Sequence, residues 1–218
     1  MSKLRVVITS GGTREYIDDV RVLTNISTGK LGAKIATVFM SHGHDVTYVA
    51  PASAQMPSGS DYSYVKVTNT KSLMEAMETL VPKADVVIQS MAVSDFTFDL
   101  KEATKISSDS AEAFIGHLRK TIAKTPKVIS NFRKWNPRGV LVGFKFTVGK
   151  SKKELTDIAK KLMSDNKLDM VFANDKSQMQ KAGDHVGVLI MKDWEEALYN
   201  KDDIATAIYD NVVRLTDK

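Results

Sequence analysis

The feature that most constrains the fold is a β-strand and a helix separated by an unusually long polar stretch. Residues 4–9 are an apolar run typical of a buried strand, and Leu31, Ile35 and Phe39 recur at helical spacing. About eighteen residues lie between them, whereas most such connections have about 2–6. In open α/β sheets, ligands bind in loops at the carboxyl ends of strands. The stretch at residues 10–32 is therefore predicted to form a binding site.

Further strands and helices alternate along the chain, as in a parallel sheet wound with crossover helices. This pattern predicts an α/β, Rossmann-like three-layer fold with a mostly parallel central sheet and a modified nucleotide-binding loop. A single domain is expected over residues 1–218, with the polar segment 97–109 as a flap or a dimerisation arm. The expected strands are 45–50, 85–89, 141–146, 169–173 and 186–192, and the expected helices are 70–80, 152–164 and 202–215.

Charge and cysteine content narrow the class of protein. The formal net charge is +5, with basic residues spread along the chain rather than gathered into a nucleic-acid-binding patch. This balance suits an enzyme with phosphate-bearing substrates, and it suits an ordinary solvated surface about equally. The chain has no cysteine, which excludes disulfides and thiolate catalysis. No apolar run reaches the roughly 20 residues of a membrane span. A cytoplasmic protein that binds neither nucleic acid nor membrane is expected.

Gly11, Gly12 and Thr13 directly follow the first strand. Two glycines let backbone N–H groups approach an anion, and a threonine hydroxyl adds a donor, although a tight turn has the same composition. The stretch lacks the G-x-G-x-x-G fingerprint of dinucleotide-binding proteins. It also lacks a Walker A loop, because Leu31 follows Gly29 and Lys30 where Ser or Thr is needed.

The residues of this stretch resemble the signature loop of the phosphopantothenoylcysteine synthetase family, also called phosphopantothenate–cysteine ligase. Elements in the same order as in that family continue to residue 175, so the resemblance covers nearly the whole chain. The matching residues are Thr9–Glu15, Ile17, Asp18, Val20, Arg21, Asn25, Ser27, Gly29, Lys30 and Gly32, followed by 91–96, Lys105-Ile106, 142–144 and 173–175.

The resemblance implies a ligase of coenzyme A biosynthesis that joins 4′-phosphopantothenate to cysteine. CTP would be the co-substrate, Mg²⁺ the metal and phosphopantothenoyl-cytidylate the intermediate, with release of pyrophosphate. It also implies a homodimer. The expected form is a stand-alone bacterial enzyme without the flavin decarboxylase domain, which would pair functionally with a separate phosphopantothenoylcysteine decarboxylase.

The resemblance also implies roles for individual residues. Arg21 and Asn25 would hold the acyl-nucleotide, and Lys105 would neutralise phosphate charge as pyrophosphate leaves. Asp95 would bind Mg²⁺. The remaining nucleotide contacts would come from Gly11, Gly12, Thr13, Met91, Ala92, Val93, Pro126, Lys127, Val128, Ile129, Phe144 and Lys161.

Several of these residues carry expectations of local structure. Thr125 is expected as the N-cap and Pro126 as the first residue of a helix, whose exposed N–H groups would bind phosphate. Lys160 and Lys161 are expected at the end of the helix before residues 169–173. Asn174 and Asp175 are expected to shape the site or to cap a turn. His42, His44, His117 and His185 show no metal-ligand spacing.

Two other functions remain open. A Rossmann-like flavin- or NAD(P)-linked oxidoreductase would be the alternative enzyme, and flavin absorbance would identify it. A non-catalytic nucleotide sensor on the same fold would bind CTP without turning it over.

Overall fold

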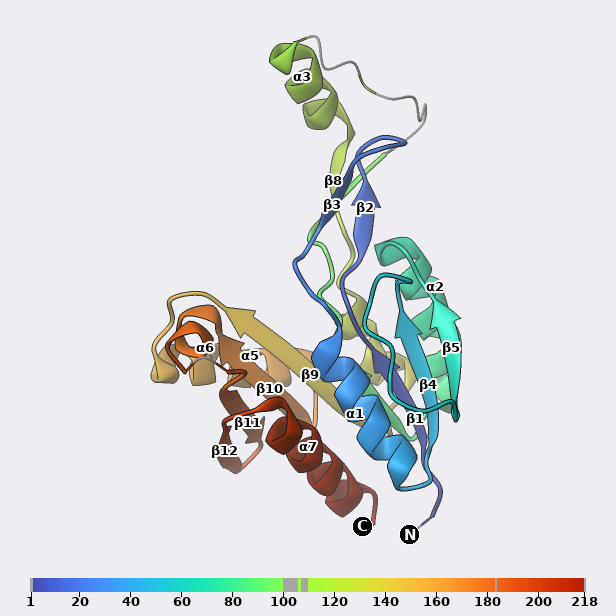
Figure 1. The fold of residues 1–218 in the computed structure, drawn as a ribbon, viewed down its shortest axis with the longest axis vertical. Helices are drawn as coiled ribbons and strands as arrows, with labels where there is room; N and C mark the ends of the chain where they lie inside the picture. Colours follow the sequence, from blue (N-terminus) through green and yellow to red (C-terminus); the bar gives the residue numbers. More distant parts are fainter. Residues whose placement is uncertain (1, 100–105, 107–109, 183, 218) are drawn as a thin grey trace.

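An eight-stranded sheet forms the centre of the fold (Figure 1). The computed structural model of the chain describes residues 2–99, 106, 110–182 and 184–217. Six strands run parallel, and an antiparallel pair closes one edge. From one edge to the other the strands are β12 (Trp194–Leu198), β11 (Gly187–Met191), β10 (Met170–Asp175), β9 (Val140–Thr147), β6 (Val86–Gln89), β1 (Arg5–Thr9), β4 (Asp45–Ala50) and β5 (Tyr62–Lys66).

Helices cover both faces of this sheet. The helices α1 (Lys30–Ser41) and α7 (Lys201–Thr216) pack on one face, and α2 (Thr70–Leu80) and α5 (Lys152–Asn166) pack on the other. The predicted α/β three-layer fold with a mostly parallel sheet is thus confirmed. Shorter helical turns are η1 (Val81–Lys83), η2 (Val128–Asn131), α4 (Phe132–Trp135) and α6 (Lys176–Ala182).

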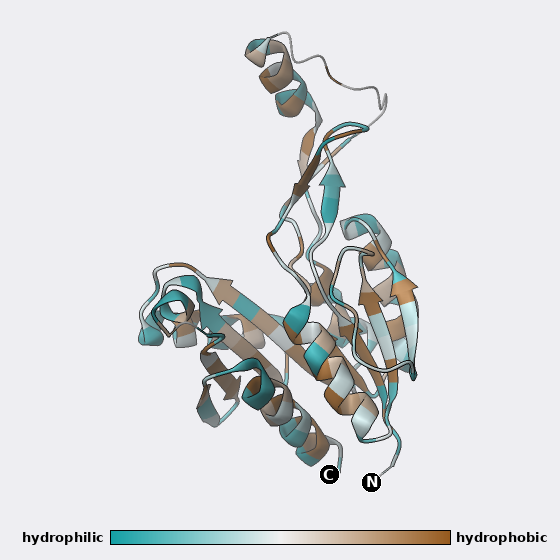
Figure 2. Cartoon of the chain, viewed as in Figure 1, coloured by the Kyte–Doolittle hydropathy of each residue, from teal (hydrophilic) through white to brown (hydrophobic). Residues whose placement is uncertain are grey.

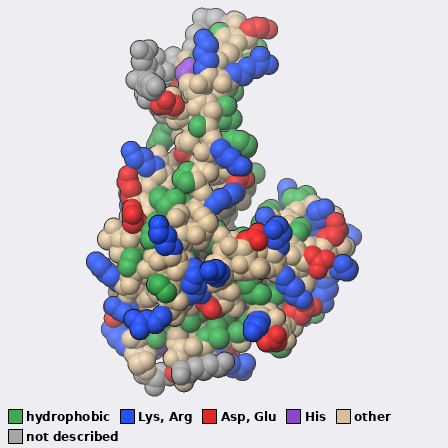
Figure 3. Space-filling view, turned by 180° about the vertical axis from the view of Figure 1, so that it is seen from behind, with side chains coloured by type: hydrophobic (Ala, Val, Ile, Leu, Met, Phe, Trp, Pro, Cys, Tyr) green, Lys and Arg blue, Asp and Glu red, His purple; other side chains and the backbone are tan. Residues whose placement is uncertain are grey.

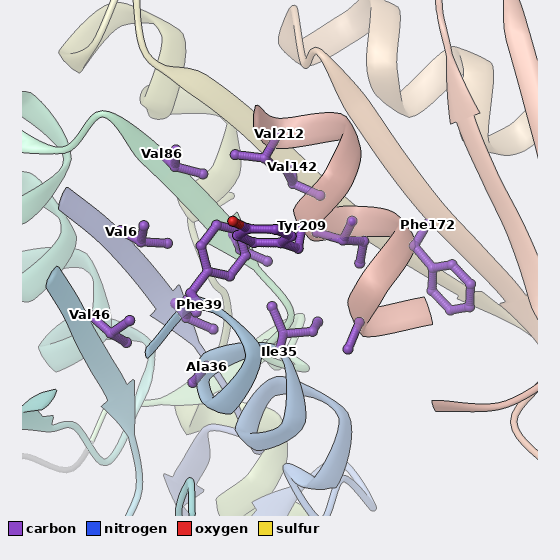
Figure 4. Packing of buried hydrophobic residues seen from close by; sticks show 14 of the residues in the cluster. Val6, Ile35, Ala36, Phe39, Val46, Val86, Val142, Phe172, Tyr209 and Val212 are labelled. Carbon is purple, nitrogen blue, oxygen red and sulfur yellow. The ribbon is translucent and has the colours of Figure 1, made fainter. Parts of the chain in front are cut away.

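The core on the α1 and α7 face is built around aromatic contacts (Figure 4). Phe39 of α1 is fully buried, and its ring meets that of Tyr209 of α7 edge to face, with the centroids 5.2 Å apart. Burying an aromatic or branched aliphatic side chain of this kind contributes about 1.5–3 kcal/mol. Figure 2 shows apolar residues concentrated in the strands of the central sheet, where both faces are covered.

Capping residues set where the helices begin and end. Asn69 and Ser72 form a reciprocal capping box at α2, and Ser151 and Glu154 form one at α5. The helix α1 ends at Ser41, and Gly43 just beyond its C-cap has a φ of 81°, in the left-handed region. Within the residues that the structure describes, no helix is long and apolar enough to cross a membrane.

An arm projects from the sheet at the carboxyl ends of β1 and β6 (Figure 1). We define the arm as the described residues of 14–24 and 96–124. Two antiparallel ribbons form it, with a helix toward its tip. The ribbons are β2 (Arg14–Tyr16) with β3 (Val22–Thr24), and β7 (Phe96–Phe98) with β8 (Ile122–Lys124), and the helix is α3 (Ala111–Thr121).

A buried carboxylate ties the base of the arm to the rest of the molecule. Glu15 is 1% exposed, and its Oε1 accepts hydrogen bonds from the backbone N–H and the hydroxyl of Thr70, each at 2.7 Å. Its Oε2 accepts the hydroxyl of Thr97, also at 2.7 Å. Glu15 therefore joins both ribbons to the start of α2.

The structure of the arm differs from two of the expectations. The stretch at 10–32 is not a loop throughout, because β2 and β3 pair with each other inside it. The predicted arm or flap at 97–109 includes only part of the second ribbon. Residues 97–99 and 106 of that segment are described, whereas the others, including Lys105, lie outside the described residues.

Candidate functional site

A cavity of about 610 Å³ opens where β1 and β4 end and α1 begins. Three segments line it: one directly after β1, one that returns from the arm to α1, and one after β4. The lining residues are Gly12, Arg14, residues 24–28, Lys30 and residues 53–56. The cavity therefore lies at the carboxyl edge of the sheet, where sites in α/β folds are expected.

Two parallel segments lie side by side where Gly12, which lines the cavity, pairs with Ala92. The N–H of Thr13 donates to the carbonyl of Ala92 at 3.1 Å, and the N–H of Ala92 donates to the carbonyl of Gly11 at 2.9 Å. Thr13 is 1% exposed, and its hydroxyl oxygen accepts the N–H of Ser94 at 2.9 Å. The Thr13 side chain thus holds the two segments together instead of facing a ligand. This differs from the expectation that its hydroxyl serves as an anion donor.

The cavity is electropositive. Arg14 and Lys30 line it, and none of the described residues in its wall carries a carboxylate. The first turn of α1 contains no acidic residue, and its N-cap, Gly29, has no side chain to occupy the free backbone N–H groups. Helix N-termini attract anions through these groups and through the helix dipole. The geometry suits a phosphate or polyphosphate.

Asn25 lies in this cavity, whereas Arg21 does not. The chain turns back between Ile17 and Arg21, so Arg21 lies at the tip of the first ribbon and Asn25 returns to its base. The expectation that both residues meet on one ligand is therefore not met within a single chain. A spacing of four residues does not bring side chains together across a ribbon turn.

Arg21 instead joins the two halves of the arm. Its Nη1 lies 3.1 Å from Asp18 Oδ2 and 3.4 Å from the carbonyl of Ile106, and its guanidinium lies 5.1 Å from the ring centroid of Phe114. Burial alone would raise the pKa of Asp18. Hydrogen bonds from the N–H groups of Val20, Arg21 and Ile106, together with the Arg21 charge, outweigh burial and hold that pKa below its ordinary value. Asp18 therefore remains an anion that anchors the ribbon turn.

Asp95 is paired with a lysine. Its Oδ1 forms an ion pair with Lys127 Nζ, and both side chains are more than half exposed. Among the described residues, no group of three or more His, Cys, Asp or Glu side chains is placed to hold a metal ion. Mg²⁺ commonly uses one or two carboxylates together with substrate phosphates. Asp95 can bind Mg²⁺ in such a shared site only once its ion pair with Lys127 is broken.

The segment at 125–129 differs from the helix start that was expected. Thr125 is buried and donates its hydroxyl to the carbonyl of Ser94 at 2.6 Å, so it is not an N-cap. Lys127 is the N-cap of η2, a 3₁₀ turn of four residues that begins at Val128, and Pro126 precedes it. Pro126 is thus not the first helical residue. Val128 is buried and Ile129 partly buried in the core, where both pack against apolar residues.

The remaining predicted residues lie elsewhere. Phe144 of β9 is partly buried, and its ring pairs with that of Phe172 with the centroids 5.6 Å apart. Lys161 forms an ion pair with Asp165 on α5, and that helix continues to Asn166, just beyond the end expected at 164. Met91, Ala92 and Val93 follow β6, and Ala92 is hydrogen-bonded to Gly11 and Thr13.

Sequence reasoning missed one wall of the cavity. The segment 53–56 is fixed by the N–H of Gln55, which donates to the carbonyl of Thr28 at 2.9 Å, and by the hydroxyl of Tyr48, which donates to the carbonyl of Gln55 at 2.7 Å. Burial raises the pKa of Tyr48 to about 12, so this hydroxyl keeps its proton. The sequence signal for this wall is a short segment of small and polar residues directly after β4, the strand that lies next to β1.

Comparisons with known proteins agree with this architecture. The family model described as the DNA/pantothenate metabolism flavoprotein C-terminal domain matches residues 1–215. Two similar proteins carry the name coenzyme A biosynthesis bifunctional protein CoaBC. The one from Methanocaldococcus jannaschii is 32% identical and the one from Thermococcus kodakarensis is 33% identical, each over 97% of this chain. Each alignment covers 51% of the relative, so the chain spans about half the length of these curated relatives.

A solved structure is also similar. The DNA/pantothenate metabolism flavoprotein from Streptococcus pneumoniae is 33% identical and superposes with a TM-score of 0.83. The match covers 97% of this chain and 99% of that one. The sheet and its flanking helices are therefore shared with the Streptococcus pneumoniae protein.

Proposed function

Because the chain belongs to the family of the DNA/pantothenate metabolism flavoprotein C-terminal domain, we propose that it is a CTP-dependent phosphopantothenate–cysteine ligase of coenzyme A biosynthesis. The observation that carries the proposal is the electropositive cavity at the start of α1, with Arg14 and Lys30 in its wall. Such a cavity suits the triphosphate of a nucleotide. The name of the two archaeal relatives supports the pathway.

The proposed reaction has two steps. A carboxylate oxygen of phosphopantothenate attacks the α-phosphorus of CTP, and the bond to pyrophosphate breaks. The cysteine amine then attacks the acyl carbon of phosphopantothenoyl-cytidylate, the bond to CMP breaks, and the amine loses a proton. Activation is needed because a free carboxylate is a poor acyl donor, whereas the mixed anhydride has a good leaving group.

The chain's own residues would act by binding and orienting these groups. Asn25 lies in the cavity wall, where an amide can hold an acyl or phosphate oxygen without adding charge. Arg14, Lys30 and the start of α1 would bind phosphates. Mg²⁺ would neutralise charge on the triphosphate, and Asp95 is the carboxylate proposed beside it. Lys105 keeps its proposed role at the departing pyrophosphate.

The function is tested with purified protein, CTP, Mg²⁺, phosphopantothenate and cysteine. Pyrophosphate is expected to appear with the amide product, and both should require all four components for full turnover. Omission of cysteine should leave the first half-reaction measurable. Absence of pyrophosphate in the complete mixture would overturn the assignment.

We further propose that the protein is a homodimer assembled through the arm and working with a phosphopantothenoylcysteine decarboxylase. Six large apolar side chains of the arm are between 38% and 64% exposed, and Figure 3 shows hydrophobic side chains along it. Isologous dimers are the commonest assemblies, and they bury apolar patches of this kind. The six are Tyr16, Val20, Leu23, Phe96, Ile115 and Ile122.

Substitution of Val20 by Lys is expected to weaken the dimer at least tenfold. Val20 is 64% exposed at the ribbon tip, and a buried valine contributes about 1.5 kcal/mol or more. Light scattering over a concentration series measures the effect. Tyr199→Lys is the matched control, because Tyr199 is 67% exposed outside the arm. A wild-type protein that is monomeric and fully active at assay concentration would overturn the proposal.

A further inference from the structure

The cavity wall at residues 53–56 is held against the start of α1 by a buried hydroxyl. Tyr48 of β4 is fully buried, and its hydroxyl donates to the carbonyl of Gln55 at 2.7 Å. The N–H of Gln55 in turn donates to the carbonyl of Thr28 at 2.9 Å. A chain of hydrogen bonds thus runs from β4 through Gln55 to the residue directly before Gly29, the N-cap of α1.

The turn at Gly29 has a conformation that suits an anion. Its φ of 77° and ψ of 0° are left-handed, and the helical residues of α1 follow directly. A left-handed residue next to right-handed ones turns successive N–H groups towards one point. Because the peptide bond is planar and trans, a bond that fixes the carbonyl of Thr28 also fixes the N–H of Gly29. The N–H of Gln55 therefore sets the direction of one of these donors.

Close packing holds the same turn from the side. A Cβ at Gly29 would lie 3.1 Å from Cβ of Ala54 and 3.3 Å from the nitrogen of Gln55. A Cβ at Gly11 would lie 2.8 Å from the same Ala54 methyl. Ser10 adds a second tie, since its hydroxyl donates to the carbonyl of Gly29 at 3.0 Å. The wall and the turn therefore form one packed unit.

The Tyr48 hydroxyl keeps its proton at neutral pH and remains a donor. Burial raises the pKa of Tyr48 to about 12, and the Ser10 hydroxyl acts in the opposite direction. The ring packs edge to face against that of Tyr62, with the centroids 6.1 Å apart. Removal of the hydroxyl alone should therefore leave the ring in place.

We propose that Tyr48 is a positioning residue for the turn that binds the polyphosphate at the start of α1. We define the strut as Tyr48 together with residues 53–56. The strut presets the N–H groups at Gly29, so the turn does not have to reorganise when an anion binds, which saves affinity. Tyr48 itself does not line the cavity, and it acts only through Gln55. The inference rests on the proposed function, which places the triphosphate at this turn.

Calorimetry on Tyr48→Phe tests the strut, with inorganic tripolyphosphate and CTP as the probes. Both should bind about tenfold more weakly than to the wild type, as expected for the loss of one hydrogen bond. The ratio of the two dissociation constants should stay at its wild-type value, because the change acts on the phosphates that the probes share.

Tyr64→Phe is the matched control. The hydroxyl of Tyr64 donates to the carbonyl of Ala50 at 3.1 Å, so the same atom is removed from the same kind of bond at the end of β4. Neither Tyr64 nor Ala50 lines the cavity. Both dissociation constants should stay within about twofold of the wild-type values.

Steady-state kinetics separate positioning from a general structural role. In the complete ligase reaction, Tyr48→Phe should raise KM for CTP about tenfold and leave kcat and KM for cysteine within about twofold. A purely structural defect would lower kcat as well. Ala54→Gly is an independent variant that removes the methyl packed against Gly29, and it should weaken tripolyphosphate and CTP in parallel.

The outcomes separate the inference from the proposed function. Unchanged tripolyphosphate affinity in Tyr48→Phe, or equal losses in Tyr48→Phe and Tyr64→Phe, overturns the inference even if amide product forms. A wild-type protein that does not bind tripolyphosphate overturns it as well. A selective loss in Tyr48→Phe, in a protein that releases no pyrophosphate from CTP, overturns the ligase assignment and leaves the strut standing.

Discussion

Substitution of Asn25 by Asp is expected to slow amide formation by about 10²–10³-fold while pyrophosphate is still released without cysteine. Asn25 lies in the cavity wall with Arg14 and Lys30. A carboxylate there repels the phosphate and the acyl oxygen of the intermediate, and it forfeits a hydrogen bond to a charged group worth about 1.5–3 kcal/mol. Quenched-flow measurement of pyrophosphate, alongside product formation with cysteine present, separates the two half-reactions.

Lys105→Gln provides the comparison. It is expected to slow pyrophosphate release itself, on the role that the family resemblance gives this residue. Lys153→Gln removes the same charge from the exposed face of α5 and should leave both steps unchanged. If Asn25→Asp abolishes the first step as completely as Lys105→Gln does, the separate roles expected for Asn25 and Lys105 are wrong.

Substitution of Gly32 by Ala should lower both stability and nucleotide binding. A Cβ at this position would lie 2.6 Å from Ser90 Oγ and 2.7 Å from Ser10 Cβ. Ser10 donates to the carbonyl of Gly29 and Ser90 to that of Thr9, so neither moves freely. Overpacking costs about 1–3 kcal/mol. For a chain of this size, the unfolding temperature should fall by roughly 2–10 °C.

Gly116→Ala is the matched control for this substitution. Gly116 lies inside α3, and a Cβ there would meet nothing within 4 Å. Alanine favours a helix over glycine by about 1 kcal/mol, so this variant should be neutral or slightly stabilised. Differential scanning calorimetry and CTP titration on both variants give the comparison. Equal unfolding temperatures for the two variants would contradict the tight packing of α1 against Ser10 and Ser90.

The layers of the fold were predictable because burial leaves a periodic signal. The apolar runs at 4–9 and 45–50 correspond to β1 and β4, and the helix expected over 70–80 is α2. These elements bury one or both faces, and the sequence records which side chains are inside. Short edge and surface elements such as β5, with little full burial, carry a weaker signal.

The arm and the cavity wall could not be predicted in the same way. The strand β2 consists of Arg14, Glu15 and Tyr16, and its conformation depends on pairing with β3 and on the contacts of Glu15. The wall at 53–56 enters the site because β4 lies next to β1, which is a property of strand order. The separation of Arg21 from Asn25 likewise depends on a turn that their spacing does not encode.

The arm has a mechanical consequence for the cavity. Its two ribbons grow from the ends of β1 and β6, which are neighbouring strands near the centre of the sheet. The segments that lead into the ribbons run parallel and are hydrogen-bonded to each other beside Gly12, which lines the cavity. Glu15 bonds the two ribbons to each other and to the start of α2, so a displacement of the arm would be passed on to this pair of segments. A partner that displaced the arm would therefore also displace the part of the cavity wall that Gly12 provides.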